Sequence, residues 1–231
     1  MFQSGHRRYD QGGGDKGEDN WRYVLEDFAK QPSKPTLDGE PSYENIPQGL
    51  HDPKQPRWTD RDVRRYAYWS VFAGAFGHTY GNNAVMQMHK PGDTDASYGV
   101  GECWCDEINA PGAAQMQHLK NLILSRPFFE RVNDQPVLAG QNGTRYERVT
   151  ATRGSSYLFV YTYTGRPFQI QMGRISGKQA QAYWYNPRTG QATDIGNLPN
   201  QGVQTFTPPD RNDWVLVLDE AAKQFRPPGV P

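Results

Sequence analysis

The stretch Pro35-Thr-Leu-Asp-Gly-Glu-Pro-Ser-Tyr-Glu44 organises the chain. It predicts a short strand over residues 36–40, because Pro41 has no N–H to give to a sheet and ends the extension. Strand residues two apart share a face, so Asp38 and Glu40 should point the same way. In a parallel α/β barrel, catalytic side chains come from this C-terminal edge of the strands. Asp-Gly and Glu-Pro are also ordinary turn sequences, which leaves a plain turn as the alternative.

The composition argues against a nucleic-acid or membrane-surface protein. Lys+Arg and Asp+Glu both number 25 in 231 residues, and we see no basic stripe or acidic tail. We therefore expect an uncharged or small partner. Aromatic residues make up 13% of the chain, which suits a folded protein and, where the rings are exposed, stacking against the C–H faces of sugars.

Two features of the sequence bear on redox state and location. Cys103 and Cys105 are separated by one residue, and a bridge needs Cα atoms about 4.4–6.8 Å apart with converging Cβ vectors, so we expect free, partly buried thiols. The flanking acids are poor companions for zinc and no second Cys/His pair follows, so we predict no metal and no cofactor.

The sequence has no run of about 18 apolar residues, so we expect no membrane insertion, and we see no signal-peptide pattern. The chain instead opens as if already inside a strand, which suggests a missing upstream part.

Residues 1–133 alternate between strand and helix patterns. Expected strands lie at 2–6, 36–40 and 78–88, and expected helices begin near Trp21, near Asp60 and at Pro111. Such alternation predicts parallel strands with crossover helices. Three units are too few for a closed barrel of eight strands.

The pattern changes after about residue 133, and residues 144–225 read as an antiparallel β-sandwich. Helix periodicity disappears, and short β-branched or aromatic runs are separated by Gly, Pro and Asn turns, as in sandwiches. The expected strands are 146–152, 157–163, 168–172, 180–185, 192–195, 203–206 and 214–218.

Several motifs, in this order, resemble the C-terminal part of bacterial apiosidase-type glycoside hydrolases. They are the runs at residues 3–6, 34–44 and 62–81, and Trp184-Tyr-Asn-Pro-Arg-Thr-Gly190. The resemblance covers nearly the whole chain. It implies the C-terminal part of a (β/α)8 TIM barrel, about strands 6–8, followed by a β-sandwich that is named for a collagen-binding domain of a collagenase.

The resemblance also implies site residues and a substrate class. Glu40 matches the nucleophile of a retaining enzyme, and the remaining candidates line the sugar pocket: His6, Asp38, Tyr43, Tyr80, Asn82, Asn83 and Trp104. The substrate would be a pectin-type polysaccharide with apiose-like side-chain sugars. The acid/base would lie in the missing N-terminal barrel half, so this chain alone should be inactive, and its parent should be exported.

Each of these assignments has an alternative. Retaining hydrolysis needs a second carboxyl about 5–5.5 Å from the nucleophile. Within the chain it could come from Asp38, Glu44 or Asp10, although Asp38 and Glu44 are better placed to orient Glu40. The histidines His6 and His78 could be hydrogen-bonded edge residues, and the Arg64-Arg65 pair a solvated or carboxylate-paired face. Trp58 and Trp104 could cover a core instead of a sugar. A carbohydrate- or protein-binding module, carried by the sandwich alone, is the rival function, and literal collagen binding is a third.

Overall fold

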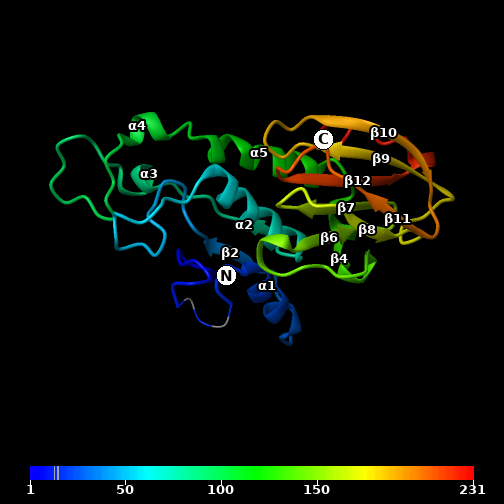
Figure 1. The fold of residues 1–231 in the computed structure, drawn as a ribbon, viewed down its shortest axis with the longest axis horizontal. Helices are drawn as coiled ribbons and strands as arrows, with labels where there is room; N and C mark the ends of the chain where they lie inside the picture. The colour runs from blue at the N-terminus through cyan, green and yellow to red at the C-terminus, as the bar shows by residue number, and fades with distance from the viewer. Residues whose placement is uncertain (13, 15) are drawn as a thin grey trace. The chain divides into compact units, whose positions relative to one another are not determined.

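The computed structural model describes residues 1–12, 14 and 16–231 (Figure 1). Its contacts divide the chain into two compact units, residues 1–71 with 75–116, and residues 72–74 with 117–231. The first is α/β and the second consists mainly of antiparallel strands. In the described residues, no helix combines the length and the apolar character needed to cross a bilayer.

The first unit is built around a small parallel sheet in the order β1-β2-β3. Phe2 pairs with Asp38, and Leu37 pairs with Gly77, so β2 is the central strand. The parallel pairing predicted from the strand–helix alternation is confirmed. The elements up to Leu124 are β1 (Phe2–Gln3), α1 (Asn20–Ala29), β2 (Leu37–Glu40), α2 (Asp60–Phe72), β3 (Gly77–His78), α3 (Asn83–Gln87), α4 (Trp104–Glu107) and α5 (Pro111–Leu124).

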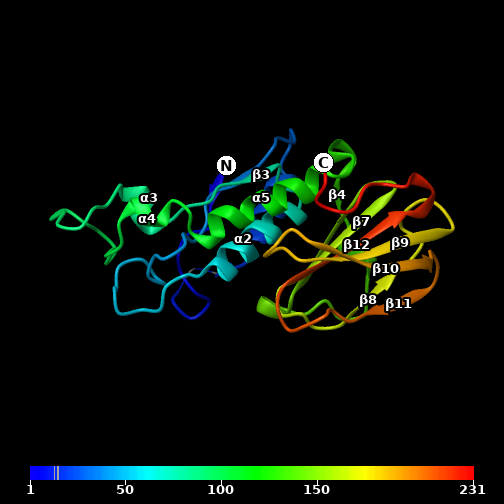
Figure 2. The ribbon, with the colours of Figure 1, turned by 90° about the horizontal axis from the view of Figure 1, so that it is seen from above.

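The third expected strand, 78–88, is mostly wrong. Only Gly77–His78 forms a strand, Asn82 makes a single bridge, and Asn83–Gln87 forms helix α3. The Asn82 side chain causes the change, because its oxygen accepts hydrogen bonds from the backbone N–H groups of Ala84 and Val85 and caps the helix. Both views show α3 and α4 side by side (Figure 1, Figure 2).

The two arginines of α2 are buried and paired with carboxylates, which is one of the two expected alternatives. The Arg64 guanidinium lies 2.6 Å from Asp60, and that of Arg65 lies 2.6 Å from Glu18. The side chains of Arg65 and Glu18 are both fully buried. The solvated alternative is therefore wrong, because a buried charge needs a partner of opposite sign.

The second unit contains two antiparallel sheets, in the orders β10-β9-β12-β7-β6-β4 and β11-β8-β5. Each of the seven runs expected from the sequence contains a strand, but the expected run 146–152 is wrong at its start, where residues 145–147 form a 3-10 helix and the strand begins at Val149. The strands are β4 (Val132–Asn133), β5 (Leu138–Ala139), β6 (Val149–Arg153), β7 (Tyr157–Thr162), β8 (Phe168–Gln171), β9 (Gln179–Tyr185), β10 (Ala192–Pro199), β11 (Val203–Phe206) and β12 (Trp214–Glu220). Four short 3-10 helices precede, separate or follow these strands: Phe128–Glu130, Gln135–Val137, Arg145–Glu147 and Ala221–Lys223.

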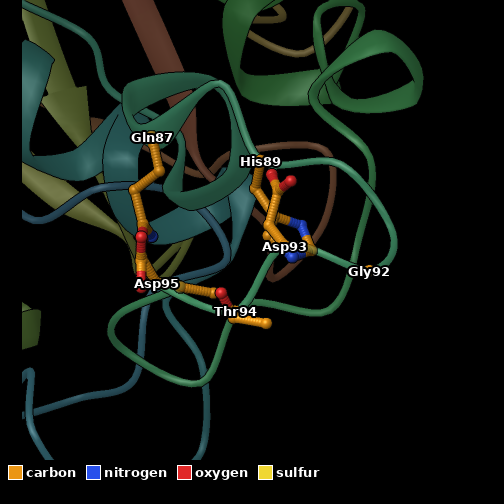
Figure 3. Close-up of a pocket in the computed structure, with 7 residues that line it drawn as sticks. Gln87, His89, Gly92, Asp93, Thr94 and Asp95 are labelled. Carbon is orange, nitrogen blue, oxygen red and sulfur yellow. The ribbon is translucent and has the colours of Figure 1, made fainter.

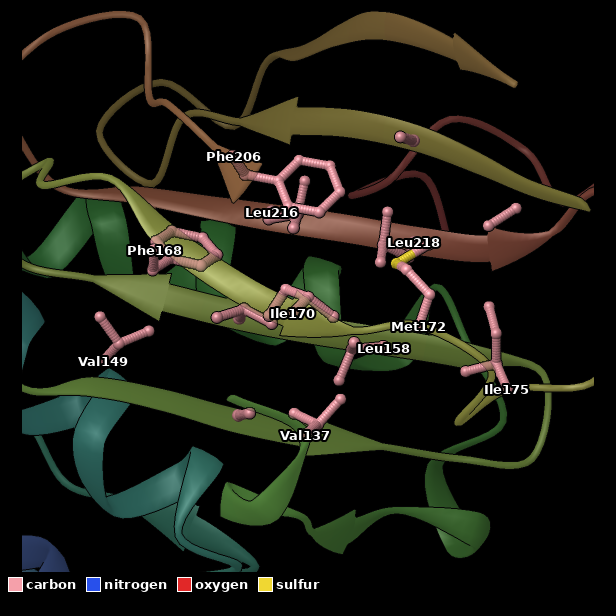
Figure 4. Close-up of a cluster of buried hydrophobic side chains, with 14 of the residues drawn as sticks. Val137, Val149, Leu158, Phe168, Ile170, Met172, Ile175, Phe206, Leu216 and Leu218 are labelled. Carbon is pink, nitrogen blue, oxygen red and sulfur yellow. The ribbon is translucent and has the colours of Figure 1, made fainter. Parts of the chain in front are cut away.

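The two sheets share one hydrophobic core. Ile170 of β8 and Leu216 of β12 are both inaccessible to solvent, and Figure 4 shows side chains from both sheets gathered in this core. Alternation in β9 places Ala180, Ala182 and Trp184 in this core. Gln179 belongs to the opposite face of the strand and is exposed. Apolar residues at every second position thus determine which face of the strand is buried.

Candidate active site

Glu40 lies at the C-terminal end of the central parallel strand. β2 ends there because Pro41 follows, and Gln3 of β1 is its partner across the ladder. The Gln3 amide donates a hydrogen bond of 2.6 Å to one carboxylate oxygen of Glu40. The other oxygen lies 3.5 Å from Nε2 of His6, and 37% of the Glu40 side chain is exposed. A carboxylate that is oriented by neighbours and open to solvent can meet a ligand.

His6 is held in one tautomer beside Glu40. The backbone N–H of Tyr43 points at Nδ1 of His6 at 3.4 Å and can only donate, so Nδ1 accepts and the neutral ring carries its proton on Nε2, facing Glu40. Burial lowers the pKa of His6, and the nearby Glu40 charge opposes that shift only in part. The His6 carbonyl accepts from Trp58 Nε1 and from the N–H of Gly49, which fixes the backbone.

The Tyr43 ring lies against the edge of His6. The ring centroids are 5.0 Å apart and the planes are perpendicular, a favourable aromatic arrangement. Gly81 lies close to the other side of Tyr43, because a Cβ at Gly81 would lie 2.4 Å from the Tyr43 ring. The strand-end segment after β3 therefore reaches the site through Gly81.

A cavity of about 420 Å³ opens beside this group. Glu40 and His6 line it together with residues of the loops after β1 and β2: Ser4, Gly5, Arg7, Gly12, Gly14, Gly17, Gly49, Leu50 and His51. The volume falls in the range of small-molecule sites, which is about 300–1,000 Å³.

Asp38 is fully buried, unlike Glu40. It accepts hydrogen bonds from the Ser4 hydroxyl at 2.6 Å, from the Ser4 N–H at 3.3 Å and from the Asn20 amide at 3.0 Å. Burial raises the pKa of Asp38, and these bonds oppose the shift. The structure thus places Asp38 where it ties β2 to β1 and α1.

The polar residues after β3 gather around Glu44. The Tyr80 hydroxyl donates to Glu44 at 2.6 Å, and so does the N–H of Gly112 at 3.0 Å. Glu44 also pairs with Asn82 in a short parallel bridge. Burial raises the pKa of both Glu44 and Tyr80. The sequence suggested Glu44 as a possible acid or as a residue that orients Glu40, and no sequence signal pointed to its bond with the start of α5.

The remaining candidates, Asn82, Asn83 and Trp104, form hydrogen bonds with neighbouring segments of the chain. The Asn82 amide donates to Glu107 at 2.7 Å, and that of Asn83 donates to two backbone carbonyls. Trp104 begins α4, where its N–H bonds to the carbonyl of His89. Among the described residues, the hydrogen bond and the ion pair of the Glu40 side chain involve Gln3 and His6 and none of these three.

The expectation of free thiols is wrong. Cys103 and Cys105 form a disulfide, with their Cα atoms 5.2 Å apart. Cys103 caps α4 from an extended conformation, and the turn into the helix brings the two Cα atoms within bridging range. Asp106 lies close to both sulfurs and completes one group of potential metal ligands in the described part of the chain. Sulfurs joined to each other cannot ligate as thiolates.

Comparison with known proteins identifies the family. The family model "Apiosidase-like, catalytic domain" matches residues 1–130, and "Putative collagen-binding domain of a collagenase" matches residues 132–219. A search of curated proteins finds no match. Two solved structures are similar throughout the chain. One, described as a glycoside hydrolase, is 52% identical with a TM-score of 0.94, over 98% of this chain and 53% of its own.

The other structure is a glycoside hydrolase family 5 protein from Bacteroides vulgatus ATCC 8482. It is 49% identical with a TM-score of 0.95, over 100% of this chain and 53% of its own. The chain therefore spans about half the length of these two structures. A family model that matches more than half of the chain and two glycoside hydrolase structures at about 50% identity agree, and the chain belongs to the apiosidase-like catalytic domain family.

Proposed function

We propose that this chain carries the nucleophile, Glu40, of a retaining glycoside hydrolase that acts on pectin-type polysaccharides with apiose-like side-chain sugars. One observation carries the proposal: Glu40 is a solvent-accessible carboxylate at the end of a central parallel strand, and it lines a cavity of about 420 Å³. The similarity to glycoside hydrolases supports the reaction class.

In this proposal each neighbour of Glu40 has a role. The carboxylate attacks the anomeric carbon while the bond to the leaving oxygen breaks and that oxygen takes a proton from a second carboxyl. Gln3 holds one oxygen of Glu40 by its hydrogen bond and leaves the other for attack. His6 is neutral, with Nε2–H toward Glu40. It therefore adds no positive charge that would repel the positive charge developing on the sugar.

The second carboxyl is proposed to come from outside these residues. Residues 1–133 would form the part of a (β/α)8 barrel around strands 6–8, with a missing N-terminal half as partner, and residues 144–225 an accessory β-sandwich. Three parallel strands with helices between them, in a chain half as long as its similar structures, support this view. The isolated chain would then be inactive, and the parent, acting on plant polysaccharide, would be exported.

The test is Glu40→Gln in a polypeptide that includes the barrel half, assayed with an activated aryl glycoside. Glutamine keeps the shape but cannot attack as an anion, so activity should fall by orders of magnitude. Glu26→Gln, on the exposed face of α1, is the matched control and should keep full activity. Equal activity of the Glu40→Gln and parent enzymes would refute the assignment. Turnover by the isolated 231-residue chain would refute the external acid.

A second function, a binding module in the C-terminal unit, is favoured by a small cavity of about 190 Å³. Tyr183 and Phe225 line it beside the amides of Gln181 and Asn197, a mixture suited to a sugar. Pulldown of the whole chain on insoluble pectin and on collagen tests it, with Tyr183→Ala as the variant that should lose pectin binding. Retention on collagen alone would favour a protein-binding module.

A further inference from the structure

A second cavity, of about 400 Å³, lies in the loop that follows α3, and Glu40 is not among its lining residues. The lining consists of Gln87, His89 and residues 92–96. Figure 3 shows Asp93 beside His89, Asp95 beside the end of Gln87, and Thr94 between these pairs. The lining is polar, and its residues have no role in the function proposed above.

The base of this loop is fixed by side chains. The Gln87 amide donates to the Ser97 carbonyl at 3.1 Å and accepts from the Ser97 N–H at 2.8 Å, as a paired strand would. The same amide nitrogen donates to Asn83 at 2.8 Å. The His89 carbonyl accepts from the N–H of Trp104 at 2.9 Å. Because the loop is anchored at both sides, the cavity is formed without a ligand.

His89 presents one acceptor to the cavity. The residue is only 6% exposed, and its Nδ1 lies 2.6 Å from the carbonyl oxygen of Glu102. A carbonyl can only accept, so Nδ1 carries the proton and Nε2 of the neutral ring has a lone pair. Within the described part of the chain, Nε2 has no hydrogen-bond partner. An unpartnered nitrogen on a largely buried ring in a cavity wall is a ready binding group.

The carboxylates add acceptors and negative charge. One oxygen of Asp93 accepts from the N–H of Lys90 at 2.7 Å, which orients the side chain and leaves its other oxygen available. Asp95 is exposed. No lysine or arginine lines this cavity among the described residues. Acceptors together with negative charge favour a ligand that has several O–H donors and no negative charge of its own.

We propose that this cavity binds a neutral sugar unit through its hydroxyl groups, with Asp93, Asp95 and Nε2 of His89 as acceptors. The inference rests on the proposed function in one respect, that the protein handles saccharides. It adds a specificity: a uronate in this place would meet two carboxylates and be rejected. A volume of about 400 Å³ is in the range of small-ligand sites.

The test is titration of the ¹⁵N-labelled 231-residue chain, at pH 7, with methyl galactoside, methyl arabinofuranoside and methyl galacturonide. We expect a neutral glycoside to shift the amide signals of Thr94 and Ala96 saturably, and the galacturonide to leave them in place. Asp95→Ala should weaken binding about tenfold or more, since it removes a hydrogen bond to a charged group. Glu26→Ala, an acid on α1, is the control.

Glu40→Gln separates this inference from the proposed function, because binding in the loop should be unchanged in that variant even if Glu40 is not the nucleophile. Equal binding of the galacturonide, or an unchanged affinity in Asp95→Ala, would overturn the proposal. So would the absence of any shift with all three glycosides. Shifts caused by CaCl₂ or ZnCl₂ alone, with none from a glycoside, would overturn it in favour of a cation site.

Discussion

A buried ion pair between Arg126 and Asp219 should dominate the stability of the C-terminal unit. Arg126, just after α5, donates from Nε at 2.8 Å and from a terminal nitrogen at 2.6 Å to the two oxygens of Asp219 on β12. The side chains are 0% and 3% exposed. The guanidinium also lies 4.7 Å from the centre of the Phe225 ring. The pair is therefore almost entirely removed from solvent, although Asp219 and Phe225 also line the cavity of about 190 Å³.

Asp219→Asn should therefore be strongly destabilising, because it leaves the arginine charge buried without its counter-ion. Removing one partner of a buried pair costs about 3–5 kcal/mol. At about 2–4 °C per kcal/mol for a chain of this size, Tm should fall by about 6–20 °C. Urea denaturation of the whole chain, followed by tryptophan fluorescence and by far-UV circular dichroism, would measure the change in the free energy of unfolding.

The double variant Arg126→Met with Asp219→Leu is the matched control, since it removes both charges and keeps the volume. Replacing a buried pair by apolar residues is often neutral or stabilising, so this variant should recover most of the loss. A cost below about 1 kcal/mol for Asp219→Asn would show that Arg126 is solvated in the folded protein, and the argument from burial would fail.

Three further changes test packing and ionisation. Gly81→Ala should cost about 1–3 kcal/mol, because its Cβ would lie 2.4 Å from the Tyr43 ring, whereas Gly77→Ala, with nothing within 4 Å, should cost nothing in the same denaturation assay. Burial raises the native pKa of Glu44, so the folded state binds its proton more tightly and the free energy of unfolding should fall as the pH rises above 4.5. Glu44→Gln should remove that part of the fall, and identical pH profiles would contradict it. Leu216→Ala should cost about 2–5 kcal/mol by leaving a cavity between the two sheets; a loss below 1 kcal/mol in urea would mean that the core collapses around it.

The sequence predicts best where a local pattern and burial agree. In β9, apolar residues at every second position predicted both the strand and its buried face, and α5 began at the expected Pro111. The segment after β3 was misjudged because one hydrogen-bonding side chain, Asn82, outweighed the strand propensity of Val85 and its neighbours. Capping depends on side-chain geometry that a propensity pattern does not contain.

Short strands were the other weak point. β4 and β5 have two residues each and belong to the two sheets of the C-terminal unit, although both precede the predicted start of the sandwich at residue 144. Val137, just before β5, is fully buried in the shared core. Two residues give no periodicity to detect, so these strands become visible only through their pairing partners.

The acids of the chain explain why the proposal places the second carboxyl elsewhere. Asp10 is exposed and binds Arg8 at 2.9 Å, on the same loop. The buried carboxylate of Asp38 accepts from Ser4, just after β1, and from Asn20 of α1, and Glu44 is buried against Tyr80 and the start of α5. Each is engaged by neighbours, and a general acid must face Glu40 across the sugar with a proton to give. A partner segment that brings such an acid to the open side of Glu40 would complete the site without moving Gln3 or His6.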